Sequence, residues 1–344
     1  MITEANLRYQ TPADVDHEWG ETYWLGLYVP EANLYAWVYM VFRAGSGAMT
    51  CDVEFIDRCS REMFDARYID IQNHLTAPAE LQRFTLANGL SFEAVDPRTF
   101  RLDYVGVDDT ELHLDLSGIH EPYDIHDPDI DPMARASREQ AIEHSGFGTA
   151  YAGHFDLTTR VTGTVKVRGQ EHQVNCLATQ DHSWGPRPER GMRPMGYVNA
   201  HFADDYVVQS IWEFDPSRPD GAQHVFKHGY VVKDGELIGG VDGSLTIDHR
   251  GLYPAKLQLS VTDENGGVHA MVGEPSAYNN WVPYGCTPTG HAMVRWTTAD
   301  GLNGVGTSME AFPLDTVTGE HLHEDLRLTS PAASDLPAFA QNGA

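Results

Sequence analysis

The sequence predicts an all-β protein made of antiparallel hairpins, and three observations support this. Apolar and polar residues alternate with a period of two along most of the chain, as they do in half-buried strands. Short segments rich in Gly, Asn and Asp separate the alternating runs, and such residues are typical of tight hairpin turns. The 7 Trp, 15 Tyr and 13 Phe residues are types that favour the pleated surface of a sheet.

The clearest strand signals recur from one end of the chain to the other. The alternating runs cover residues 23–43, 100–119, 154–169, 195–214 and 243–263. The turns between strands include AGSG, ANG, DD, RG, DG and ENGG. Strands that follow one another through such short turns pair as antiparallel neighbours.

One segment interrupts this pattern near the middle of the chain. Residues 120–132, HEPYDIHDPDIDP, are acidic and rich in proline, so they cannot continue a strand. The following residues, 131–146, predict a short helix, with Asp131 as its cap, Pro132 in its first turn and Gly146 as its stop. We therefore expect an interdomain linker here.

This linker divides the expected organisation into four parts. They are an N-terminal β domain (1–130), a linker helix (131–150), a C-terminal β domain (151–330) and an extended tail (331–344). With 344 residues the chain is long enough for two hydrophobic cores.

Charge and composition limit the partners. The formal net charge of −27 repels nucleic acid and anionic membrane surfaces, so we expect neither as a partner. No stretch approaches the length of a membrane span, and we expect a soluble, cytoplasmic protein without membrane insertion. The four cysteines show no CxxC spacing, which favours reduced thiols. A homodimer is compatible with the sequence, which does not fix the oligomeric state.

Residues 180–191, QDHSWGPRPERG, combine several reactive side chains at the end of a predicted strand. Side chains at the end of a barrel strand can point into a cavity. One hypothesis makes Asp181 an acid held by His182, with Trp184 as an apolar wall. The alternative makes Asp181 the cap of a turn and Trp184 a core residue.

The first hypothesis corresponds to a definite chemistry. A carboxylic acid buried against apolar surface has a raised pKa and can protonate an unactivated alkene near neutral pH. Indole faces stabilise the resulting cation by ~2 kcal/mol or more when they are shielded from water. Trp184, Trp212 and Trp281 are available in this half of the chain.

The DHSWG segment resembles the Asp-His-Asn-Trp-Gly signature of the carotenoid 1,2-hydratase superfamily, which includes kievitone-hydratase-like proteins and lipocalin-like Diels–Alderases. The resemblance covers chiefly residues 145–215, and the extension GPRPERGMRP is similar to an uncharacterised bacterial branch. It implies two consecutive lipocalin-like β-barrels, a cavity between them, and a hydrophobic terpenoid, polyketide or phenolic substrate. The family acid corresponds to Asp181, and GVGTSME, ending at Glu310, is similar to a second family motif.

The sequence departs from the family at two positions beside the acid. Ser183 replaces the family Asn, and Thr179 stands where a Tyr is usual. Glu310 also falls one residue late in its motif.

Several further residues are candidates for substrate contact. Arg187, Arg190 and Arg193 follow the motif and could hold a carboxylate or phenolate through guanidinium contacts. Tyr197 and His201 share one face of the next strand, where His201 is a candidate base.

The acidic segment before the linker is a weaker candidate for a cation site. It contains His120, Glu121, Asp124, His126, Asp127, Asp129 and Asp131. Because the spacing fits neither a calcium loop nor HExxH, a solvated linker is the favoured interpretation and no metal ligand is assigned. GEHLHED (319–325) is interpreted as a surface hairpin in the same way.

Together these observations predict a lyase or isomerase of the hydratase, dehydratase or cyclase type that needs no cofactor. Asp181, His182 and Glu310 are the expected catalytic residues. Trp184, Arg187, Tyr197, His201 and Trp212 are the expected substrate contacts. The rival hypothesis is a non-catalytic carrier of a hydrophobic small molecule, since paired barrels can hold a ligand without changing it. A metal-dependent enzyme using His120 and His126 is a third.

Overall fold

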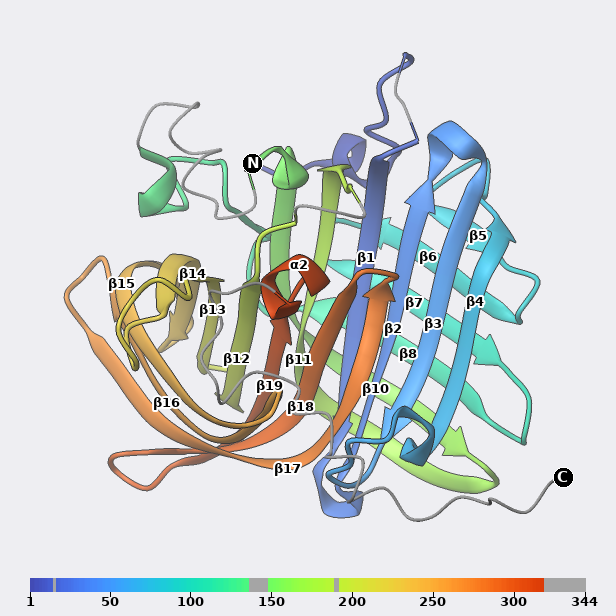
Figure 1. The fold of residues 1–344 in the computed structure, drawn as a ribbon. Helices are drawn as coiled ribbons and strands as arrows, with labels where there is room; N and C mark the ends of the chain where they lie inside the picture. Colours follow the sequence, from blue (N-terminus) through green and yellow to red (C-terminus); the bar gives the residue numbers. More distant parts are fainter. Residues whose placement is uncertain (15–16, 136–147, 189–191, 319–344) are drawn as a thin grey trace, which may run out of the picture.

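The computed structural model shows an all-β protein, as the sequence predicts. It describes residues 1–344 apart from 15–16, 136–147, 189–191 and 319–344. The strands form two units that lie side by side, a curled sheet and a closed barrel (Figure 1).

The first unit is an 11-stranded antiparallel sheet. Its order is β4-β3-β2-β1-β11-β10-β8-β7-β6-β5, with β9 paired to β10. The sheet curls over its own core, but its end strands β4 and β5 do not pair. Its strands are β1 (Trp19–Val29), β2 (Leu34–Arg43), β3 (Ala48–Ile56), β4 (Tyr68–Thr76), β5 (Arg83–Thr85), β6 (Leu90–Asp96), β7 (Thr99–Val105), β8 (Glu111–Gly118), β9 (Tyr123–Asp124), β10 (Gly153–Val167) and β11 (Gln170–Pro186).

The second unit is a closed antiparallel barrel of consecutive strands from β12 to β19. The strands are β12 (Met195–Ala203), β13 (Tyr206–Phe214), β14 (His224–Lys233), β15 (Glu236–Arg250), β16 (Tyr253–Asp263), β17 (Val268–Tyr284), β18 (Thr287–Thr298) and β19 (Asn303–Ala311). Its interior is filled by apolar side chains such as Val198, Trp212 and Trp296.

Helical structure in the described residues is limited to short segments. These are η1 (Glu4–Leu7), η2 (Pro30–Ala32), η3 (Ala44–Ser46), η4 (Met63–Asp65), η5 (Pro132–Arg135), η6 (Gly148–Tyr151) and α2 (Leu314–Thr318). None of the helices in the described part of the chain is long and apolar enough to cross a bilayer. Most of the predicted linker helix, and the tail, lie outside the described residues.

The pairing of β10 and β11 differs from the domain boundary expected near residue 150. These strands belong to the first sheet, where β10 pairs with β8 and β11 pairs with β1. The acidic segment therefore connects two neighbouring strands of one sheet. It reaches the barrel on the way, since Asp131 Oδ2 lies 2.5 Å from Nδ1 of His228 in β14. The chain enters the barrel only after Pro186.

At β1 and β2 the first sheet is buried on both faces, because it packs against its own far strands on one side and against the barrel on the other. In β1, Tyr23, Leu25 and Leu27 alternate with Thr22, Trp24 and Tyr28. The Tyr28 hydroxyl lies 2.5 Å from Thr307 Oγ1 in β19, so Thr22, Trp24 and Tyr28 face the barrel. This explains why β1 and β2 lack the alternation between buried and exposed residues that marks a half-buried strand.

The close packing of β10 on β11 gives a test of the fold. A Cβ atom added at Gly153 would lie 2.0 Å from the Trp184 ring. We expect Gly153→Ala to lower the free energy of unfolding by about 1–3 kcal/mol in urea denaturation, because the indole must move. Gly26→Ala is the matched control, since the nearest atom there is at 3.7 Å. Equal effects of the two changes would contradict this packing.

Candidate active site in the cavity between the two units

A cavity lies between the curled sheet and the barrel. It encloses about 740 Å³ of space between atoms, a volume that includes its open mouth. Strands β1, β2 and β11 supply one wall, and β12, β17, β18 and β19 supply the other. The lining is mainly aromatic and apolar, with a few polar side chains, as is usual for small-molecule sites.

Asp181 lies on the cavity wall in β11. Its Cα partners are Trp24 in β1 and Asp156 in β10, so the residue sits in the middle of the first sheet. Ser183, two residues further on, lines the same cavity because alternate residues of a strand share a face.

The environment of Asp181 suits a proton donor. The net pKa of its carboxyl is about 7: burial raises it most, His154 and Arg187 lower it, and the nearby Asp156 carboxylate raises it. A carboxyl with this pKa is partly protonated at neutral pH and can both donate and accept a proton.

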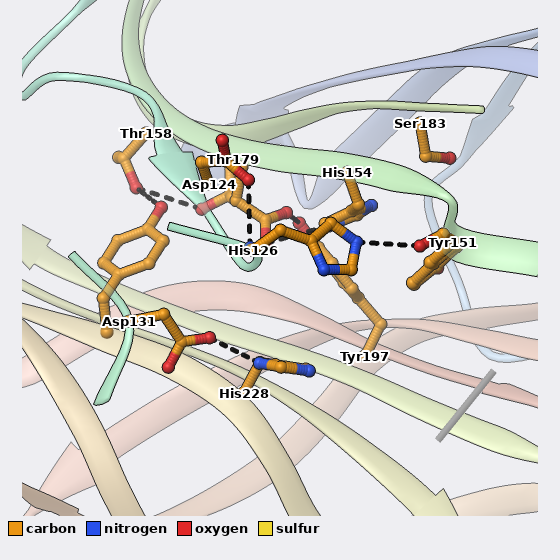
Figure 2. A network of polar contacts seen from close by, with 12 residues as sticks. Asp124, His126, Asp131, Tyr151, His154, Thr158, Thr179, Ser183, Tyr197 and His228 are labelled. Atoms are coloured by element: carbon orange, nitrogen blue, oxygen red, sulfur yellow. Dashed lines mark hydrogen bonds and ion pairs between the residues drawn. The ribbon is translucent and has the colours of Figure 1, made fainter. Parts of the chain in front are cut away.

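Beside Asp181 lies a buried polar group formed by His154, Asp156 and Tyr197. Asp156 accepts a hydrogen bond of 2.6 Å from the Tyr197 hydroxyl, and its other oxygen lies 3.1 Å from His154 Nε2. Burial lowers the pKa of His154, but the Asp156 carboxylate outweighs this and the net shift is upward. Figure 2 shows His154 and Tyr197 approaching each other from the sheet and the barrel. The arrangement favours an imidazolium–carboxylate pair next to the acid.

Arg187 is a charged residue on the cavity wall near Asp181 and Ser183. Its Nη2 donates a hydrogen bond of 2.8 Å to Ser183 Oγ, and its guanidinium carbon lies 5.0 Å from the centre of the Tyr151 ring. Ser183 Oγ also lies 2.7 Å from Thr22 Oγ1. Ser183 therefore positions the arginine.

Aromatic rings form the apolar wall. Trp281 lies with its ring centre 5.3 Å from that of Trp24 and 5.0 Å from that of Tyr39. The Tyr39 hydroxyl lies 2.8 Å from the Tyr284 hydroxyl. All four residues line the cavity.

His291 of β18 is a further polar residue of this wall. Its Nε2 lies 2.8 Å from the Tyr35 hydroxyl, and its Nδ1 has no hydrogen-bond partner in the described residues. Burial lowers the pKa of His291 to about 3. The imidazole is therefore neutral near pH 7 and can hydrogen-bond a ligand without taking up charge.

Of the residues expected from the sequence, Asp181, Arg187 and Tyr197 line the cavity, and the others lie elsewhere. His182 points away from it, stacks on Tyr23 at 4.1 Å between ring centres, and has its Nδ1 2.8 Å from the Thr22 carbonyl oxygen. Trp184 packs on the same face of the sheet as His182. His182 cannot hold Asp181, because successive side chains of a strand point to opposite faces.

Two of the expected residues, Trp212 and Glu310, point into the barrel and not into the cavity, because successive side chains of a strand alternate between its two faces. Trp212 fills the barrel interior and donates its indole N–H to Ser210. Glu310 also faces inward, because its neighbour Met309 lines the cavity. Glu310 instead pairs with His224 and His249 at 2.9 and 2.7 Å.

His201 lies between the two units but does not line the cavity. Its Nε2 lies 2.9 Å from Thr179 Oγ1 and its Nδ1 lies 3.1 Å from the Val305 carbonyl oxygen. Both ring nitrogens are therefore engaged, and burial lowers the pKa of His201 to about 4. Its role in this structure is to join the sheet to the barrel.

The histidines of the acidic segment are also engaged by the backbone. His120 Nδ1 lies 2.6 Å from the Glu121 carbonyl oxygen, and His126 Nε2 lies 2.8 Å from that of Tyr151 (Figure 2). The described residues contain no group of three His, Cys, Asp or Glu side chains placed to hold a metal ion.

Sequence inspection missed His154, Asp156 and His291. A signal for the first two was present, since His154 and Asp156 alternate with Phe155 and Leu157 at the start of a strand, and this start pairs with the motif. His291 gave no local signal, because its place on the cavity wall depends on the packing of the barrel against the sheet.

The chain combines a closed barrel with a curled antiparallel sheet packed against it, and solved structures of other proteins share this architecture. Kievitone hydratase from Nectria haematococca shares it with a TM-score of 0.53, at 9% identity over 85% of this chain and 88% of its own. An AttH-like protein from Nitrosomonas europaea gives a TM-score of 0.52, at 12% identity over 85% of this chain and 92% of its own. At these identities the likeness establishes the fold.

The chain belongs to the DUF7064 family, a domain of unknown function, whose model matches residues 3–312. No protein of curated function matches the sequence.

The Glu310 cluster gives a stability prediction. Burial raises the pKa of Glu310, but His249 and His224 outweigh this and the net value is about 2, below the ordinary value of 4.5. The ionised carboxylate therefore stabilises the fold fully above pH 4.5, and this contribution disappears as the pH falls toward 2. We expect Glu310→Gln to lower the free energy of unfolding at pH 6 by about 3 kcal/mol.

The difference in the free energy of unfolding between the natural protein and Glu310→Gln should shrink below pH 4.5, as measured by urea denaturation. A second loss of stability is expected in the natural protein as the pH rises above 6.5. The pKa of His249 is raised in the folded state, so its protonated form stabilises the fold, and this contribution disappears as His249 loses its proton. Asp115→Asn, a change at an exposed carboxyl of the first sheet, is the control. A pH-independent difference would contradict the ion-pair interpretation.

Proposed function

We propose that the protein is a cofactor-independent lyase or isomerase that performs acid–base chemistry on a hydrophobic unsaturated substrate in this cavity. The observation that carries the proposal is Asp181, a cavity-facing carboxyl whose pKa is raised to about 7 by burial. The described residues provide no side-chain hydrogen bond to this carboxyl, so it is available to a substrate.

In the proposed hydration, protonated Asp181 gives its proton to one carbon of an alkene and leaves a carbocation at the other. A water molecule adds to the cation through its oxygen. The Asp181 carboxylate then takes a proton from the bound water, which restores the acid and completes the addition of H₂O. The reverse sequence is a dehydration, and loss of a different proton from the cation gives an isomer.

The cavity wall suits a cationic intermediate. The faces of Trp24 and Trp281 stabilise a positive charge, by ~2 kcal/mol or more when water is excluded. His291 stays neutral and can orient a water molecule or a substrate hydroxyl, although its low pKa makes it a poor base. Asp181 therefore serves as both acid and base in the proposal.

Two features favour this proposal over a carrier. The structural neighbour kievitone hydratase is a hydratase by name, which supports the reaction class at the level of the fold. A carrier also gains nothing from an acid that is partly protonated at neutral pH and free of hydrogen bonds. The recovery of a bound ligand unchanged after long incubation would favour the carrier instead.

Replacement of the acid tests the proposal. The substrates are a panel of prenylated phenols, terpenoids and unsaturated polyketides, incubated in H₂¹⁸O and analysed by mass spectrometry for addition of labelled water or for isomers. We expect Asp181→Asn to lower turnover by about 100-fold or more, because an amide cannot donate the proton.

Asp115→Asn is again the matched control, since it removes an exposed carboxyl from the same sheet without touching the cavity. Turnover of Asp181→Asn within a few-fold of the natural protein would exclude the acid role. The melting temperatures of both variants, compared with that of the natural protein, show whether a loss of turnover comes from the missing acid or from unfolding.

The pH profile provides an independent check. The protonated form of Asp181 is the active one for alkene protonation, so kcat/KM should fall as the pH rises through about 7. Below that value the profile should be flat until the fold itself is affected. A descending limb that stays in place in Asp181→Glu and Asp181→Asn would assign the titration to another group.

A further inference from the structure

Arg187 is the only Lys or Arg that is fully buried among the described residues, with 3% of its surface exposed. The chain as a whole carries a formal charge of −27, so Lys and Arg residues are scarce, and those in ion pairs among the described residues are at least partly exposed. A single cation placed inside an aromatic cavity therefore needs an explanation.

The arginine is held firmly in place. Its backbone N–H donates to the Glu18 carbonyl oxygen, and its own carbonyl oxygen accepts a hydrogen bond of 3.0 Å from Arg43 Nη1. Gly20 leaves room for the side chain, since a Cβ atom there would lie 3.0 Å from Arg187 Cγ. Ser183 and the Tyr151 ring fix the guanidinium itself.

The guanidinium lacks a counter-charge. None of the ion pairs in the described part of the chain involves Arg187, and its Nη1 is buried without a hydrogen-bond partner. Asp181 is close enough for the two groups to influence each other, but the two are not in contact. Burial of an uncompensated charge is unfavourable by several kcal/mol, so the site is incomplete as it stands.

We propose that Arg187 is an anion-binding residue, and that the ligand of the cavity is an amphiphile with a carboxylate or phenolate on Arg187 and an apolar body against Trp24 and Trp281. The proposal rests on the proposed function for the identity of the cavity as a substrate site. It adds the chemical class of the substrate. The anionic group and the reacting alkene then occupy fixed positions relative to Asp181.

The test compares two ligands of nearly the same shape, 2-naphthoate and 2-naphthamide, by isothermal titration calorimetry. We expect the natural protein to bind the carboxylate at least about tenfold more tightly, because a charge-assisted hydrogen bond is worth more than a neutral one. Arg187→Met should remove this preference and weaken naphthoate about tenfold or more, while naphthamide changes less than about twofold.

Arg193→Met is the matched control, because Arg193 follows the same motif but is 47% exposed and lies 3.6 Å from Glu213. It should keep the preference. If Arg187→Met does not fold, Arg187→Lys serves instead. Lysine keeps the charge but lacks the two parallel N–H donors of the guanidinium, so this variant should retain only part of the preference for naphthoate. Equal binding of the two ligands by the natural protein, or an unchanged preference in the Arg187 variants, would overturn the proposal.

Asp181→Asn separates this inference from the proposed function. The variant lacks the acid but keeps Arg187, so it should still prefer naphthoate over naphthamide. In this variant, preference for naphthoate with turnover retained would leave the anion site standing and reject the acid role of Asp181. Loss of turnover without any preference would support the acid role and reject the anion site.

Discussion

The pairing of β11 with β1 is the constraint on which the site depends. It places β10 and β11 in the first sheet and sets Asp181 beside Trp24 on one side and Asp156 on the other. Because side chains alternate, the same register sends Asp181 and Ser183 into the cavity and sends His182 and Trp184 into the sheet's own core. A shift of one residue would exchange the two sets.

Several buried hydrogen bonds join the sheet to the barrel. The hydroxyls of Tyr28, Tyr35 and Tyr39 reach across the contact to Thr307, His291 and Tyr284. Tyrosine suits this position because its ring supplies apolar area and its hydroxyl satisfies a buried polar partner. These directed contacts fix the barrel against the sheet and thereby fix the width of the cavity.

Charge within the cavity is arranged in two parts. His154 and Asp156 neutralise each other beside Asp181, whereas Asp181 and Arg187 face the cavity with no hydrogen-bonded counter-ion among the described residues. The first pair helps set the proton affinity of Asp181, and the second pair offers an acid and an anion site to a ligand. This division is what distinguishes the cavity from an ordinary apolar pocket, and it supports both proposals.

The sequence by itself determined the all-β class and its antiparallel hairpins, because period-two alternation and turn residues are local signals, and the DHSWG motif singled out Asp181 as a candidate. It could not determine which residues share a wall. The chain returns to the first sheet after the acidic segment, and only the packing of the barrel brings His291 and Trp281 opposite Asp181. Glu310 and Trp212 lie inside the barrel for the same reason, since the face that a strand presents depends on its register with distant strands.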